Sequence, residues 1–194
     1  MGGVAAEIHN TTEDFTTLHE RFRLDLGHLL YEPMEALKPL LAQRPSDWPF
    51  LDSLGTTIGD MFERMGEGSL DWGFCHGDLA DSNVYFHDGD LTVFDFDCGG
   101  MGWRAYDLAA FLTSLIDARE AVANPEALWA AFLSGYRNRR DISERDLSMI
   151  PTFVALRQIW VLGVHVQTLN EEQRLPHFFD HIINFLKGWK LTEG

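Results

Sequence analysis

The sequence predicts a mainly α-helical fold with one small β-hairpin. Apolar residues recur at intervals of three and four over both ends of the chain, which is typical of helices. Short segments rich in aromatic and β-branched residues occupy the middle, and the turn pair Asp88-Gly89 separates two of them. With 194 residues and 45% hydrophobic content, the chain can bury one substantial core, so we expect a single lobe over residues 1–194.

The first third of the chain is predicted to be helical. Between Asp14 and Gln43 the helical period is carried by Phe15, Leu18, Phe22, Leu26, Leu29 and Leu30. Pro33 is expected to divide this stretch into two helices, because proline disrupts a helix interior. A further helix is expected from Trp48 to Met65, ending at Gly66.

The middle of the chain predicts strands and then a return to helices. The expected strands cover Asp71–His76, Val84–Phe86 and Leu91–Asp95, with Asp88 and Asp90 as turn residues. Helices are expected again from Tyr106 to Leu115, after Asn124-Pro125, after Ser143 in a capping box with Asp146, over Pro151–Leu169 and over Leu175–Trp189.

Composition and charge exclude several classes of protein. The formal charge of −15 argues against a nucleic-acid binder, which needs clustered Lys and Arg. No stretch approaches the roughly 18 apolar residues of a membrane span, and the N-terminus does not look like a signal peptide. Cys75 and Cys98 are too few for a disulfide scaffold, so we expect a cytoplasmic protein. The acidity fits a cationic substrate or a divalent metal, and equally a solvated acidic surface.

One segment gathers the residues that can carry chemistry. It reads His76-Gly77-Asp78-Leu79-Ala80-Asp81-Ser82-Asn83, and Asp95-Phe96-Asp97 follows twelve residues after Asn83. A turn with Asp78 at its apex places Asp78 and Asn83 on one side of a loop, and a hairpin return brings Asp95 back beside Asn83. Carboxylate and amide oxygens are suitable ligands for Mg²⁺, which leaves Asp78 for another task.

Protein kinases divide these tasks in the same order along the chain. A catalytic-loop Asp accepts the proton of the acceptor hydroxyl, an Asn five residues later binds one metal ion, and a later Asp binds metal that bridges the phosphates. Here Gly77 replaces the Arg of the protein-kinase loop, and Asp97 replaces the Gly that ends its metal motif. The pattern therefore indicates a separate branch of the superfamily.

At these positions the sequence resembles the aminoglycoside phosphotransferase and choline kinase family. The segment Trp103–Ala109, which contains Tyr-Asp-Leu-Ala, resembles the start of the helix that follows the metal motif in that family. The sequence around Asp95 is most similar to the homoserine-kinase-like and stress-response-kinase branch. The resemblance implies ATP and Mg²⁺ as cofactors. The implied roles are Asp78 as catalytic base, Asn83 and Asp95 as metal ligands, His76 as a brace of the loop, Asp107 as a hydrogen-bond acceptor for the loop backbone, and Asp97 as a supporting or second-metal residue.

The resemblance covers only the C-terminal lobe of the kinase-like fold. Family members place before it a β-rich lobe with a Gly-rich loop and a strand Lys that pairs with the phosphates. Here Gly66-Glu67-Gly68 follows a predicted helix, and the three lysines Lys38, Lys187 and Lys190 lie on no predicted strand. We therefore expect the nucleotide-clamping lobe to be missing from this chain.

The expected reaction is phosphoryl transfer from ATP to a hydroxyl group of a small, cationic acceptor such as an aminoglycoside, choline or a homoserine-like molecule. Asp81, Glu171 and Glu172 are candidate substrate contacts. The alternatives are a non-catalytic binding or regulatory module of the pseudokinase type, and a lobe that needs a homodimer or a partner chain on its uncovered face. A zinc site of Cys75, His76, His87 and Cys98 is disfavoured, because no pair has ligand spacing.

Overall fold

The computed structural model describes residues 1–19, 21–42, 44–66, 68–118, 121–168 and 176–191. The described residues are mostly helical, with seven α-helices and two small sheets. They form two compact units: Met1–Leu24 with Leu70–Val154, and Asp25–Ser69 with Ala155–Gly194. We call these the sheet unit and the helical unit and describe each by itself.

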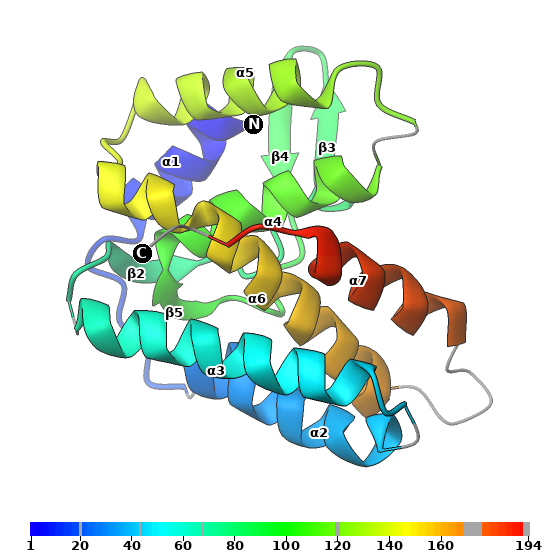
Figure 1. Ribbon diagram of the computed structural model, residues 1–194. Helices are drawn as coiled ribbons and strands as arrows, with labels where there is room; N and C mark the ends of the chain where they lie inside the picture. Colours follow the sequence, from blue (N-terminus) through cyan, green and yellow to red (C-terminus); the bar gives the residue numbers. More distant parts are fainter. Residues whose placement is uncertain (20, 43, 67, 119–120, 169–175, 192–194) are drawn as a thin grey trace. The chain divides into compact units, whose positions relative to one another are not determined.

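The sheet unit contains both sheets and four helices or parts of helices (Figure 1). Its elements are α1 (Gly2–Thr11), β1 (Phe22–Leu24), β2 (Trp72–Cys75), a short 3-10 turn (Asp81–Asn83), β3 (Val84–His87), β4 (Asp90–Val93), β5 (Gly100–Trp103), α4 (Arg104–Asp117), α5 (Pro125–Arg137) and the first part of α6 (Glu144–Thr168). α1 packs against α5. The core of this unit is aromatic, with Tyr106, Tyr136 and Phe153 fully buried.

The three-stranded sheet has the order β1-β5-β2. β1 runs parallel to β5 with Phe22 opposite Gly100, and β2 runs antiparallel to β5 with Cys75 opposite the same glycine. A Cβ atom on Gly100 would lie 2.1 Å from the carbonyl oxygen of Phe22. Only glycine therefore lets β1 approach β5 this closely.

The predicted hairpin is confirmed. β3 pairs with β4 from Val84↔Val93 to His87↔Asp90. The two residues that connect them, Asp88 and Gly89, both have positive φ angles, 50° and 91°. That pair of angles is the one that a two-residue turn between twisted strands requires.

Two predicted helix starts are found with their caps. The Asn124 side chain accepts a hydrogen bond from the backbone N–H of Ala127, and Pro125 opens α5. Ser143 Oγ accepts from the N–H of Asp146 at the start of α6. The Asp146 carboxylate accepts from the N–H of Asp71 and so ties the start of β2 to α6.

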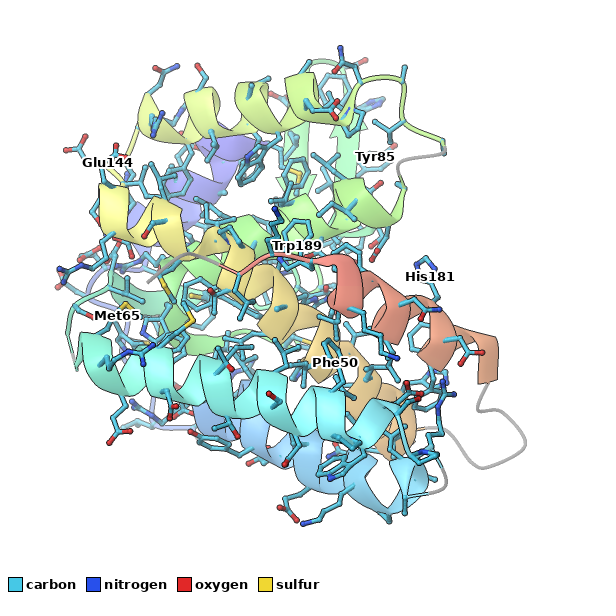
Figure 2. The ribbon with its side chains drawn as sticks, in the orientation of Figure 1. Phe50, Met65, Tyr85, Glu144, His181 and Trp189 are labelled. Atoms are coloured by element: carbon cyan, nitrogen blue, oxygen red, sulfur yellow. The ribbon has the colours of Figure 1, made fainter. Side chains whose placement is uncertain are left out.

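The helical unit consists of a short π-helix (Gly27–Tyr31), α2 (Glu32–Leu41), α3 (Asp47–Met65), the second part of α6 and α7 (Pro176–Gly188). Its core is aliphatic and includes Leu30, Leu37 and Ile58. Figure 2 labels Met65 at the end of α3, where Gly66 stops the helix as predicted. Asp47, buried at the start of α3, has a lowered pKa because Lys187 and Arg44 donate hydrogen bonds to it against the cost of burial.

The predicted helix over the segment after Asp14 is wrong in its first part. Residues 22–24 form β1 rather than a helix, because their pairing with β5 outweighs the local helical period. Pro33 does lie near the junction of two helical elements, as predicted: the π-helix Gly27–Tyr31 ends two residues before it, and Pro33 lies in the first turn of α2. α1 and β5 were not predicted.

The expectation that no stretch approaches a membrane span is wrong for α6, which is long and apolar enough to cross a membrane by length and composition alone. Of its most apolar window, 61% is buried inside the protein, which is the pattern of a core helix. Pro151 lies within this helix, so the helix predicted after Ser143 and the separate helix predicted from Pro151 are one continuous helix.

Candidate active site

The loop between β2 and β3 brings Asp78 and Asn83 together. The side-chain amide of Asn83 donates to the backbone carbonyl of Asp78 and to its carboxylate oxygen Oδ2, both at 2.9 Å. Two tight backbone contacts, Ala80 N–H to Asp78 and Asn83 N–H to Ala80, fold the loop between them. Asp78 is half-buried and Asn83 is buried, so the carboxylate remains accessible while the amide is fixed.

His76 braces this loop with both ring nitrogens. Nε2 lies 2.9 Å from the carbonyl oxygen of Phe94, and Nδ1 accepts from the N–H of Asp78 at 3.2 Å. Since a carbonyl can only accept and an amide N–H can only donate, the proton is on Nε2. The ring also packs against Phe96 at 4.4 Å between centroids. His76 is therefore committed to holding the loop and is not placed as an acid or base.

Asp107, on α4, accepts hydrogen bonds from the backbone of the loop. Its Oδ2 accepts from the N–H of His76 at 2.7 Å, and its Oδ1 accepts from the N–H of Gly77 at 2.8 Å. These are the contacts that the family resemblance implies. They fix the two residues that precede Asp78.

His9 is a contact of this network that the sequence analysis missed. It is fully buried on α1, its Nε2 lies 3.0 Å from Asp107 Oδ2, and its Nδ1 lies 2.8 Å from the Tyr136 hydroxyl. Burial alone would raise the pKa of Asp107, but His9 and the two loop amides hold it below its ordinary value. The sequence signal that could have located His9 is its spacing from Gly2, Ala5 and Ala6, because residues at these intervals lie on one face of a helix, and here that face is buried.

The hairpin returns the chain to Asn83, as expected. The N–H of Phe94 donates to the carbonyl oxygen of Asn83 at 3.1 Å, so Asp95 directly follows a residue bonded to the loop. Asp95 is exposed and has a φ of 66°, a left-handed conformation that is uncommon outside glycine. Asp97 is also exposed and lies two residues further along the same turn.

The remaining candidate residues are less informative. Asp81 is exposed in the 3-10 turn that precedes β3, on the same loop as Asp78. Glu171 and Glu172 lie outside the described residues. The structure therefore gives no placement for two of the three candidate substrate contacts.

The donor set fits a divalent metal. Asn83 uses its amide N–H groups on Asp78, which leaves its side-chain oxygen as a ligand, and Asp95 offers an exposed carboxylate. Oxygen atoms of this kind are what Mg²⁺ and Ca²⁺ prefer. Asn83 and Asp95 are thus the residues that could hold a metal here, and Asp97 could add a third oxygen donor.

A second group of side chains of the kinds that bind metal ions includes Asp107. His9, Cys75 and Asp107 are all buried, and one ligand atom of each lies within 4.8 Å of the others. Both oxygens of Asp107 already accept hydrogen bonds, and burial raises the pKa of the Cys75 thiol well above its usual value. The group is better explained by hydrogen bonding than by metal, since a bound metal requires a thiolate.

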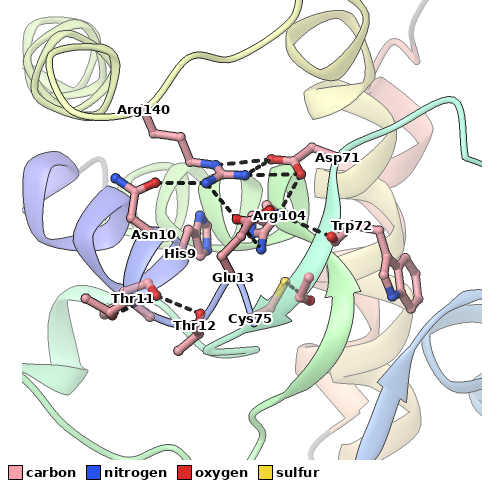
Figure 3. Close-up of polar contacts among 12 residues, drawn as sticks. His9, Asn10, Thr11, Thr12, Glu13, Asp71, Trp72, Cys75, Arg104 and Arg140 are labelled. Carbon is pink, nitrogen blue, oxygen red and sulfur yellow. Dashed lines mark hydrogen bonds and ion pairs between the residues drawn. The ribbon is translucent and has the colours of Figure 1, made fainter. Parts of the chain in front are cut away.

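A charged cluster beside the sheet holds the segment before β2 in place (Figure 3). Arg104 Nη1 donates to Asp71 Oδ1 at 2.6 Å, and Arg140 Nη2 donates to Asp71 Oδ2 at 3.0 Å. Glu13 lies 3.0 Å from both guanidinium groups, as an ion pair with Arg104 and as a hydrogen-bonded partner of Arg140. Two cations and two carboxylates thus balance at a site where Arg104 is almost completely buried.

Comparison with known proteins identifies the family. A sequence model described as the phosphotransferase enzyme family matches residues 1–142. The chain belongs to this family. Among proteins with similar sequences, an uncharacterized protein of Deinococcus radiodurans is 36% identical over 197 residues, covering 100% of this chain and 57% of that protein. The amicoumacin kinase of Bacillus subtilis is 22% identical over 184 residues, covering 90% of this chain and 53% of that kinase.

Solved kinase structures share the fold of this phosphotransferase chain. The amicoumacin kinase hAmiN in complex with AMP-PNP, Ca²⁺ and Ami matches with a TM-score of 0.73 at 20% identity, over 96% of this chain and 56% of that one. A microcompartment-associated aminopropanol kinase matches with a TM-score of 0.65 at 23% identity, over 96% and 57%. The chain therefore spans about half the length of the relatives it matches.

Proposed function

We propose that this chain is the catalytic lobe of a phosphotransferase that moves the γ-phosphoryl group of ATP to a hydroxyl group of a small, cationic acceptor. One observation carries the proposal: Asp78, hydrogen-bonded by Asn83 on a loop that His76 and Asp107 hold, stands next to the turn that presents Asp95. Membership of the phosphotransferase family supports it.

Asp78 is suited to the role of base. Its carboxylate is half-buried, accepts one hydrogen bond from Asn83 and belongs to a loop whose backbone is fixed at His76 and Gly77. In the proposed reaction, the acceptor oxygen forms a bond to the γ-phosphorus, the bond to the bridging oxygen of ADP breaks, and the hydroxyl proton passes to Asp78. Fixing the carboxylate in advance lowers the cost of orienting it for that step.

Asn83 and Asp95 would hold the metal ion, which supplies positive charge to the phosphate oxygens when it is bound. The hAmiN kinase structure contains AMP-PNP and Ca²⁺, so that protein binds a nucleotide analogue and a divalent cation. The oxygen donors of Asn83 and Asp95 support the same kind of ligand set in this chain. ATP and Mg²⁺ remain part of the proposal.

The acceptor class rests on charge and on the relatives. The formal charge of −15 favours cations near the protein surface. Aminopropanol, named in one of the similar kinases, combines a cationic nitrogen with a hydroxyl group, and so does choline, the acceptor that the family resemblance suggests. We propose an acceptor of this kind and a cytoplasmic location, where ATP is available.

A second candidate function is a binding lobe that depends on another polypeptide for its nucleotide. The lysines favour it: Lys38 lies on α2 over Trp48, and Lys187 on α7 pairs with Asp47. Neither lies on a strand, where a kinase uses a Lys to bind the phosphates.

A phosphoryl-transfer assay separates the two. Wild-type protein and Asp78→Asn would be incubated with MgATP and with aminopropanol, choline or homoserine, and phosphate esters would be followed by ³¹P NMR. The first candidate predicts ester formation by wild type and a loss of about 10²–10⁴-fold in Asp78→Asn, the usual contribution of a general base. The second candidate predicts neither nucleotide binding nor ester formation by this chain alone. Equal rates in both proteins would contradict the role of Asp78.

A further inference from the structure

Arg21, which lies outside the motifs described above, donates hydrogen bonds to the turn that contains Asp95. Arg21 donates from Nη2 to the carbonyl oxygen of Phe96 at 2.7 Å and to that of Asp97 at 3.2 Å, and from Nε to that of Gly99 at 3.0 Å. Three backbone carbonyls of one short turn therefore converge on a single guanidinium group. The planar, forked donor set of arginine suits this arrangement, and a lysine ammonium cannot reproduce it.

The sheet puts Arg21 in this position. Arg21 directly precedes β1, whose first residue, Phe22, is opposite Gly100 on β5. Gly99 and the turn lie immediately before β5, so the register places Arg21 alongside the end of the turn. The close approach of β1 and β5 at Gly100 keeps this register, since a side chain there would meet the Phe22 carbonyl.

Asp95 is held on both sides by these contacts. The carbonyl of Phe94, before it, binds His76 Nε2, and the carbonyl of Phe96, after it, binds Arg21 and also the N–H of Gly99. Between them Asp95 keeps a φ of 66°. Such backbone conformations persist at functional sites when surrounding contacts enforce them. Arg21 supplies the contacts on the C-terminal side of Asp95.

We propose that Arg21 is a positioning residue that fixes the Asp95–Gly99 turn, and through it the direction of the Asp95 carboxylate toward the metal ion. The inference rests on the proposed function for its metal, and on the geometry alone for its effect on the turn. Contacts that orient a metal ligand commonly change metal affinity by about 10–100-fold when they are removed. Arg21 is expected to act at that level.

Two variants and one control test the proposal. Arg21→Gln removes the charge and the fork, and Arg21→Lys keeps the charge and loses the fork. Arg23→Gln is the control, because Arg23 lies two residues along the same strand with its guanidinium 5.1 Å from the ring of Trp72. Thermal unfolding of all four proteins shows whether stability is shared, and Arg21→Lys remains available if Arg21→Gln does not fold.

The first readout needs no metal. Amide hydrogen exchange at Phe94 and Gly99 would be measured by NMR in the metal-free proteins, with Phe111 in α4 as an internal reference. The expected result is faster exchange at Gly99 in both Arg21 variants, with Phe111 unchanged and the control like wild type. Wild-type exchange at Gly99 in Arg21→Gln would overturn the proposal.

The second readout is the affinity for Mn²⁺ in the presence of AMP-PNP, followed by electron paramagnetic resonance. Both Arg21 variants are expected to bind Mn²⁺ about 10–100-fold more weakly than wild type. Full affinity in Arg21→Lys would overturn positioning, because it assigns the effect to charge. If wild type itself binds no Mn²⁺ with AMP-PNP, the proposed function fails for this chain, and the exchange readout still decides whether Arg21 holds the turn.

Discussion

Asp107 connects three parts of the site through one buried carboxylate. It accepts from the loop amides of His76 and Gly77 and from His9 on α1, and His9 in turn contacts Tyr136 on α5. Burial raises the pKa of Tyr136, so its hydroxyl stays protonated and able to donate to His9. The loop that carries Asp78 is thus connected to α4 through Asp107, to α1 through His9 and to α5 through Tyr136.

The lowered pKa of Asp107 predicts a pH dependence of stability. The unfolded chain protonates this carboxyl at a higher pH than the folded protein, so its contribution is complete above the unfolded pKa of about 4 and is lost as the pH falls through the lower folded value. Urea unfolding of wild type and Asp107→Asn between pH 3 and 7 measures it. The difference in unfolding free energy should narrow below pH of about 4, and a difference that is constant with pH would contradict this.

Single residues of the site were predictable where they form a motif along the chain. Asp78, Asn83 and Asp95 could be found because a loop and a two-residue hairpin turn fix their local geometry. His9 and Arg21 were not found, because their partners lie 98 and 75 to 78 positions away and neither belongs to a local pattern.

At the scale of elements, the loop after β2 depends on Gly77. Its φ is 80°, and a Cβ atom there would lie 2.2 Å from the carbonyl oxygen of Cys98. Gly77→Ala is expected to destabilise the protein by about 3 kcal/mol or more, which combines about 1–2 kcal/mol for a left-handed residue with about 1–3 kcal/mol for overpacking. Thermal or urea unfolding measures the change.

Gly89 is the matched control for Gly77. Its φ is 91°, and a Cβ atom would meet nothing within 4 Å. Gly89→Ala should therefore cost only the conformational part, about 1–2 kcal/mol. Equal losses of stability in the two variants would show that the contact with Cys98 does not matter.

In the charged cluster, Asp71, directly before β2, binds Arg104 at the start of α4 and Arg140 after α5. Removing Asp71 leaves Arg104, whose side chain is 2% exposed, with Glu13 as its ion-pair partner. Asp71→Ala is expected to cost about 3 kcal/mol in unfolding free energy, the lower end for breaking a buried pair. Glu7→Ala, which removes the exposed partner of Arg139, should cost less than about 1 kcal/mol. Similar costs for the two variants would contradict the importance of burial.

Elements were predictable where caps and turns mark them. α3, α5 and the β3–β4 hairpin were found because Gly66, Asn124 and Asp88-Gly89 specify their ends. β1 and β5 were missed because each has only three or four residues and exists through pairing with a distant strand. The local apolar period around Phe22 therefore predicted the wrong element.

At the scale of the whole molecule, exposed apolar side chains of the sheet unit predict association. Phe15, Leu18 and Phe22 are exposed, Leu18 completely at 104%. We expect concentration-dependent self-association, or capture of a partner chain, because these large exposed apolar side chains lie close together in the chain, and exposed apolar surface on a soluble protein commonly marks an interface. Sedimentation velocity would detect it, and Leu18→Ser should weaken it without affecting the fold. A monomer at all concentrations would contradict the expectation.

The central claim is that Asn83 and Asp95 make a metal-dependent nucleotide site in this chain. The most direct test is calorimetric titration of the purified protein with ATP, with and without Mg²⁺, repeated on Asp95→Ala. The account predicts binding by wild type that requires Mg²⁺ and is lost in Asp95→Ala. Binding that is the same in both proteins, or an absence of metal-dependent binding by wild type, would contradict it.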